Sequence, residues 1–93
     1  MQTAAETLRT VKEAIRNKHA WPGGYPLYIV MADGEAMSVE SARAEWRQIA
    51  HSTIRGERGN WAAAGAEINW EDGELYCCHS GERIESAYAE PDA

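Results

Sequence analysis

The chain has 93 residues, of which 44% are hydrophobic and 26% are charged, and its formal net charge is −6. These values predict one folded domain over residues 1–93 and exclude an intrinsically disordered chain. No stretch approaches the ~20 apolar residues of a membrane span, and the N-terminus lacks the layout of a signal peptide, so we expect a cytoplasmic protein.

The N-terminal segment predicts an amphipathic helix. Thr3 and Glu6 stand three residues apart and form a capping box, which predicts that a helix begins at residue 4. Val11 and Ile15 fall on one apolar stripe of this helix, which we expect to end near residue 17 or 18. The connection that follows is rich in Pro and Gly.

A strand hairpin and a second helix are expected next. Residues 27–32 are apolar throughout, which is typical of an inner strand. Asp33 and Gly34 predict a tight two-residue turn into a short return strand. Ser38 can cap a second helix, because its hydroxyl can accept a hydrogen bond from a first-turn amide. We expect that helix to end before Gly56.

The last third of the chain predicts a second hairpin. Residues 62–70 read as a half-buried strand, and a second Asp-Gly turn leads into a returning strand at 74–78. A last strand is expected at 82–88, followed by a loose tail at 89–93. The whole pattern predicts an α+β domain, in which two helices pack on one face of a small, mostly antiparallel sheet of two hairpins.

Four positions repeat the spacing of a zinc ribbon, in which two C-x-x-C pairs supply four ligands. Ser38 and Ser41 occupy the first pair and Cys77 and Ser80 the second, with Gly81 directly after. A structural zinc ion needs thiolate or imidazole ligands in a tetrahedron, and serine does not replace a thiolate. We therefore expect these positions to be the vestigial knuckles of a degenerate ribbon, with no metal and no cofactor.

Short blocks of sequence accompany these knuckle positions. They are Gly24-Tyr25-Pro26-Leu27-Tyr28, Asp33-Gly34, Trp46, Asn69-Trp70-Glu71, Leu75-Tyr76-Cys77 and Gly81-Glu82-Arg83-Ile84-Glu85-Ser86-Ala87-Tyr88. In these blocks the chain resembles a family of small phage and prophage proteins with zinc-ribbon-like cysteine pairs, here largely replaced by serine. The resemblance implies a fold and a mobile-element origin, but no activity.

The charge of the chain is unevenly distributed. Residues 60–93 contain eight acidic residues and one basic residue, a net charge of −7, whereas residues 1–20 carry +2. An acidic surface of this kind repels nucleic acid and anionic membranes and attracts basic surfaces. The residues that we expect to contact a partner are Glu67, Glu71, Asp72, Glu74, Glu82 and Glu85.

Small acidic phage proteins of this kind resemble anti-CRISPR proteins as a class. Many of those present carboxylates where DNA phosphates would lie in an RNA-guided complex, whose DNA channel is positively charged. The resemblance implies an inhibitor that binds a host protein or ribonucleoprotein complex through its basic DNA-binding surface and blocks target DNA binding. We expect it to act as a monomer in the bacterial host cytoplasm, without direct contact to nucleic acid or membrane.

An adaptor is the alternative hypothesis. A ribbon-derived, non-catalytic module could dock on another protein through apolar side chains, and Trp21, Trp61 and Tyr88 are the candidates if they are exposed. Ionic strength separates the two hypotheses, because salt weakens binding between exposed charges and not apolar docking.

Enzymatic activity is not expected. The sequence contains no G-x-S-x-G, P-loop or H-E-x-x-H motif. Cys78 and His79 are not a nucleophile and its base, because neighbours on a strand point to opposite faces. His19 and His51 are isolated in the sequence.

Overall fold

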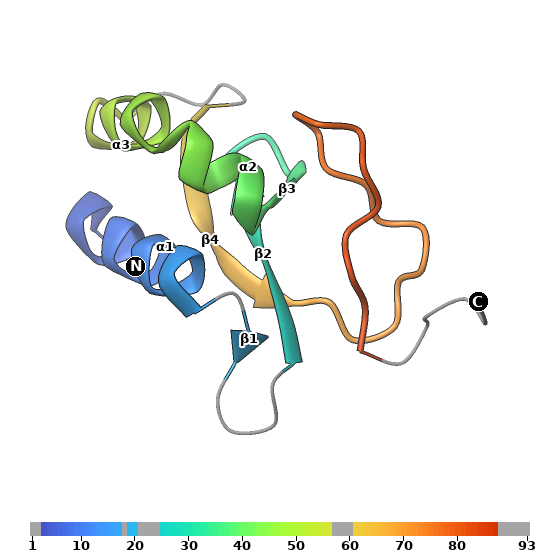
Figure 1. Cartoon of the computed structure of the whole chain (residues 1–93). Coiled ribbons are helices and arrows are strands. Elements are labelled where there is room, and N and C mark those ends of the chain that lie inside the picture. Colours follow the sequence, from blue (N-terminus) through green and yellow to red (C-terminus); the bar gives the residue numbers. More distant parts are fainter. Residues whose placement is uncertain (1–2, 18, 21–24, 57–60, 88–93) are drawn as a thin grey trace.

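The structure is a computed structural model that describes residues 3–17, 19–20, 25–56 and 61–87. Within these ranges the chain forms three helices and four strands (Figure 1). In chain order they are α1 (Ala4–Asn17), β1 (His19–Ala20), β2 (Tyr25–Met31), β3 (Ala36–Ser38), α2 (Val39–Ala44), α3 (Trp46–Ile54) and β4 (Ala63–Ile68). The expected α+β class is confirmed. None of the described helices is long and apolar enough to cross a membrane.

β2 is the central strand of the antiparallel sheet. β3 and β4 both pair with residues 28–30 of β2, so they must lie on opposite edges of it. Ile29 lies opposite Met37 of β3 and Ala66 of β4, and its side chain is fully buried. A short pairing between β1 and the N-terminal end of β2, which the sequence did not predict, completes the sheet.

The hairpin between β2 and β3 is confirmed, but its loop is longer than two residues. Met31 N–H donates to the Glu35 carbonyl at 2.8 Å, which encloses three loop residues. Gly34, with φ of +89°, is in the left-handed region at the end of that loop. A three-residue hairpin loop is typically a type I turn followed by one left-handed residue, and Asp33-Gly34 fits those last two positions.

α1 forms as its sequence predicts. Thr3 N–H donates to Glu6 Oε1 at 2.9 Å and Glu6 N–H donates to Thr3 Oγ1 at 3.1 Å, which is a reciprocal capping box. These hydrogen bonds lower the pKa of the Glu6 carboxyl. Val11 and Ile15 are buried on the inner side of the helix, which packs mainly against β4.

The expected second helix is divided into α2 and α3. Glu45, with φ −109° and ψ +25°, leaves the helical conformation between them. Both helices pack against α1, but α2 also contacts β2 and β3 whereas α3 contacts β4, so the break lets Ala42 and Ile49 both reach the core. Ser38 caps α2 as expected, since its Oγ accepts from Ser41 N–H at 3.1 Å.

The prediction of a second hairpin is wrong. β4 pairs with the free edge of β2 instead of with residues 74–78. In the described part of residues 69–87, which we call the C-terminal arm, only Tyr76 and Arg83 form a β-bridge. Pairing with β2 satisfies the backbone of β4 against a long apolar strand, and the arm then bends back on itself.

The arm lies beside β3, away from α1 and α3, and contacts the start of α2. Figure 1 shows α1 and α3 to the left of β2 and β4, and the arm, in orange and red, to the right. The arm contributes Cys77 and Ile84 to the hydrophobic core. It therefore packs as part of the domain. The expected turn at residues 57–60 and the expected tail at 89–93 lie outside the described residues.

Candidate functional site

The four knuckle positions meet in space, although 36 residues separate Ser41 from Cys77. Ser38 ends β3 and Ser41 lies in the first turn of α2, whereas Cys77 and Ser80 belong to the C-terminal arm. The contact between arm and hairpin is reinforced next to the sulfur, where Cys78 N–H donates to the Ala36 carbonyl at 2.8 Å. We call the group formed by Ser38, Ser41, Cys77 and Ser80 the Cys77 cage.

Hydrogen-bond donors surround the sulfur of Cys77. Ser38 N–H donates to Sγ at 3.2 Å, and the N–H groups of His79 and Ser80 donate to it at 3.4 Å. Ser41 Oγ lies 3.4 Å from Sγ, so its O–H can donate as well when the sulfur is ionised. Two of these four donors belong to the turn of the arm, and the other two belong to the β3–α2 junction.

These donors make Cys77 acidic. Burial of the side chain, which is only 3% exposed, by itself raises the pKa of the thiol. The hydrogen bonds from Ser38, and then those from Ser41 and Ser80, outweigh burial and lower the pKa from 9.0 to about 6. Cys77 is therefore mainly a thiolate at neutral pH.

The neighbouring Cys78 behaves in the opposite way. Burial raises the pKa of its thiol, and the negative charge of Cys77, Glu35 and Asp33 raises it further. Cys78 is nevertheless exposed, and its sulfur forms no disulfide. At neutral pH the two adjacent cysteines thus differ in charge as well as in exposure.

The cage does not fit a structural zinc ion. Its donor set is one thiolate and three hydroxyl groups, whereas zinc sites use thiolate, imidazole or carboxylate ligands. Across the described residues, no group of three His, Cys, Asp or Glu side chains is placed to hold a metal ion. Amide and hydroxyl donors take the place of a cation as the groups that stabilise the thiolate.

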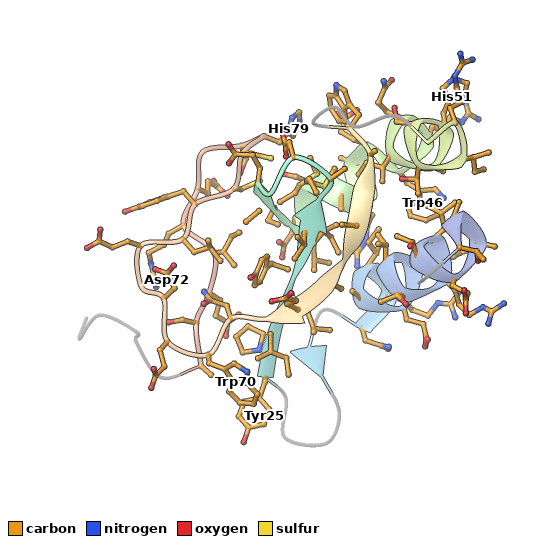
Figure 2. The ribbon with its side chains drawn as sticks, turned by 180° about the vertical axis from the view of Figure 1, so that it is seen from behind. Tyr25, Trp46, His51, Trp70, Asp72 and His79 are labelled. Atoms are coloured by element: carbon orange, nitrogen blue, oxygen red, sulfur yellow. The ribbon has the colours of Figure 1, made fainter. Side chains whose placement is uncertain are left out.

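His79 connects the turn of the cage to the helical side of the molecule. Its Nε2 lies 3.6 Å from Glu45 Oε2, at the break between α2 and α3. Its ring also meets the edge of Trp61, with the ring centroids 5.7 Å apart. Figure 2 shows His79 at the tip of the arm, near the end of the sheet, and His51 well away from it on α3. His79 thus supports the position of the arm.

All six carboxylates selected from the sequence are exposed. Glu67 lies on β4, and the other five lie on the arm. Tyr28 connects the two groups: burial raises the pKa of its phenol, and the charges of Glu67 and Asp72 raise it further. Glu67 and Asp72 therefore act on the same part of the sheet surface.

A groove lies between the arm and the sheet. Its volume is about 300 Å³, and residues 82–85 form one of its walls. The other wall comes from the start of β2 and the start of α2. Glu40, Glu82 and Glu85 line this groove together with Arg83, so it adds a recessed area with a net charge of −2 to the carboxylates at Glu71–Glu74.

Sequence reasoning missed Asn69, which organises the base of the arm. Its side chain is 3% exposed, and its Nδ2 donates to the carbonyls of Asp72 at 3.1 Å and Glu85 at 3.0 Å. Its Oδ1 accepts from Asp72 N–H at 3.2 Å. Asn before an acidic Asp-Gly turn is a local signal for such a structure, because Asn side chains readily bond the backbone of turns.

Two aromatic residues next to Asn69 are also part of this region. The rings of Tyr25 and Trp70 are in contact, with centroids 4.6 Å apart, and Trp70 is 46% exposed.

No protein-family model, curated protein or solved structure matches the chain. The interpretation of this surface therefore depends on its own residues.

Proposed function

We propose that the protein is a non-catalytic, anti-CRISPR-like inhibitor from a phage or other mobile element. It binds a host RNA-guided nucleic-acid complex in the bacterial cytoplasm and blocks the binding of target DNA. The observation that carries this proposal is the acidic C-terminal arm. Its residues 69–87 contain five acidic residues and Arg83, a net charge of −4, and all five carboxylates are exposed.

The way the arm is held supports this role. The Cys77 cage attaches the tip of the arm to α2, and Asn69 joins the two chain segments at its base, near Asp72 and Glu85. Arg83 is half-buried, and its Nη1 donates to the Gly73 carbonyl at 3.4 Å. Carboxylates held in fixed positions bind a basic surface with a smaller loss of conformational entropy than carboxylates on a free tail.

A charge-reversal pair tests the proposal. Glu71→Lys/Glu74→Lys reverses two arm charges but keeps Asp72, whose Oδ1 accepts from Glu74 N–H at 2.9 Å. The matched control is Glu13→Lys/Asn17→Lys/Gln48→Lys, which changes the net charge equally at three exposed positions on α1 and α3. We expect the arm variant to lose at least about tenfold in affinity for an RNA-guided complex, and the control to lose much less.

The measurement is capture of RNA-guided complexes from nuclease-treated bacterial lysate, followed by titration of the purified complex at rising ionic strength. Wild-type binding should weaken steeply with salt, because the charges involved are exposed. If the arm variant binds as tightly as the control, or if salt has no effect, the electrostatic mechanism is wrong.

The adaptor hypothesis remains the second candidate because some apolar side chains are exposed. These are Ile54, Trp70 and Tyr76. Of the residues proposed for docking from sequence, Trp61 is half-buried against His79, and Trp21 and Tyr88 lie outside the described residues. Capture of a partner whose affinity is independent of salt would favour this function.

A further inference from the structure

Trp70 presents about half of its surface to solvent on a part of the molecule that is otherwise acidic. Its side chain is 46% exposed and its ring contacts that of Tyr25, at a centroid distance of 4.6 Å and an interplanar angle of 54°. Figure 2 shows the two rings together at one end of the sheet, with Asp72 on the neighbouring part of the arm. An exposed indole of this kind is a common anchor in protein interfaces.

The backbone beneath this aromatic pair is fixed. Asn69 N–H donates to the Pro26 carbonyl at 3.0 Å, so each aromatic residue is the direct neighbour of a bonded residue. The Asn69 side chain also holds the turn that follows Trp70, through both the N–H and the carbonyl of Asp72. Trp70 is therefore held in place before any partner arrives, which lowers the entropy cost of binding.

The carboxylates that follow Trp70 in the chain favour a cationic partner. Glu71 and Asp72 follow Trp70 directly, and both are exposed. A cation is attracted to the face of an indole ring and to carboxylates alike. Arginine suits such a surface better than lysine, because its planar guanidinium stacks on an aromatic ring while its N–H groups bind a carboxylate in a bidentate manner.

We propose that Trp70 and Tyr25, together with Glu71 and Asp72, form a docking site for an arginine side chain of a basic protein segment. The site rests on the proposed function, since it specifies the partner element that the acidic arm engages. It predicts that the bound surface is rich in arginine and that lysine serves less well at this point.

Two synthetic peptides of equal length and charge, one arginine-rich and one lysine-rich, test this proposal by calorimetric titration. Wild-type protein should bind the arginine peptide about fivefold more tightly, which corresponds to a cation–π contribution of roughly 1 kcal/mol. Trp70→Ala should remove that preference, and Trp70→Phe should keep part of it. Tyr76→Ala, which removes another exposed aromatic ring of the arm, is the matched control and should keep the preference in full.

The outcomes separate this site from the proposed function. Equal affinity of wild-type protein for the two peptides, or an unchanged preference in a folded Trp70→Ala variant, overturns the arginine site even if an RNA-guided complex is captured. An arginine preference that depends on Trp70 supports the site even if no such complex is captured. Circular dichroism of each variant establishes that it is folded.

Discussion

Cys77 is a buried thiol that the surrounding backbone keeps ionised. Three N–H groups and one hydroxyl lie within 3.4 Å of its sulfur, and they come from both the arm and the β3–α2 junction. The negative charge on the sulfur therefore favours the folded state, because only folding brings these donors together. This coupling makes the stability of the domain depend on pH.

The free energy of unfolding should rise between about pH 6 and about pH 9. The pKa of Cys77 is lowered from 9.0 to about 6, so the unfolded chain binds the proton more tightly than the folded one. The contribution is fully present above the unfolded pKa and is lost as the pH falls through the folded pKa. It reaches at most about 4 kcal/mol. Urea unfolding at a series of pH values measures it.

Two serine variants identify the group responsible. Cys77→Ser keeps a hydrogen-bond acceptor but does not titrate in this range, so the rise in stability with pH should disappear. Cys78→Ser changes the neighbouring thiol, which is exposed, and should retain most of the rise. An equal rise in the wild type and in Cys77→Ser would show that Cys77 is not the group that titrates.

At the scale of elements, the β3–α2 junction and the turn of the arm converge on the sulfur of Cys77. Ser38 and Ser41 begin α2, and the turn from Cys77 to Gly81 brings Ser80 to the same place. Gly81, with φ of +79°, permits the tight turn, in which its N–H donates to the Cys77 carbonyl at 2.9 Å. The spacing of these four positions predicts that they belong together, and the fold brings them around the Cys77 sulfur.

Replacing the three serines should create a zinc site. In Ser38→Cys/Ser41→Cys/Ser80→Cys, four thiolates would surround one point, and we expect Co²⁺ to bind with the absorption spectrum of a tetrahedral thiolate complex. Zinc should then stabilise the fold, since structural zinc contributes on the order of 10–16 kcal/mol in finger peptides. The same variant with Cys77→Ala is the control and should bind much more weakly. A folded triple variant without that spectrum would contradict the proposed tetrahedral arrangement.

The elements of the second half illustrate why local patterns were insufficient. Residues 62–70 were correctly identified as containing a strand, because Ala66 and Ile68 alternate with polar neighbours. The partner of that strand was not predictable from the adjacent Asp-Gly turn, because β2 offered a longer apolar edge. The Asp72-Gly73 turn is organised by Asn69 instead of by strand pairing.

At the scale of the whole molecule, the domain has two parts with different kinds of support. Most of the apolar core comes from the three helices and the sheet, whereas the arm contributes Cys77 and Ile84 to it and is otherwise held by hydrogen bonds of the Cys77 cage and of Asn69. An element held by few apolar contacts opens more readily than the core does. The arm should therefore be the part that exchanges its amide hydrogens first.

Asn69→Ala should loosen the arm selectively. The variant leaves the partly buried backbone carbonyls of Asp72 and Glu85 without their partner, which costs at most about 3 kcal/mol. Hydrogen exchange should become faster at arm amides, while the protection of α1 and β4 changes little. Gln48→Ala, at an exposed position of α3, is the control. Uniform loss of protection across the whole chain would show that the arm does not open separately.

The sequence by itself determined the local features of this protein, and the tertiary structure decided which of them meet. The capping box at Thr3, the cap at Ser38 and the exposed carboxylates depend on near neighbours, so their patterns could be read directly. The pairing of β4 with β2 and the acidity of Cys77 depend on residues far apart in the chain. A buried strand must find hydrogen-bond partners for its backbone, and a buried thiol ionises only where hydrogen-bond donors surround it. In this protein those partners come from distant parts of the chain, so only folding brings them together.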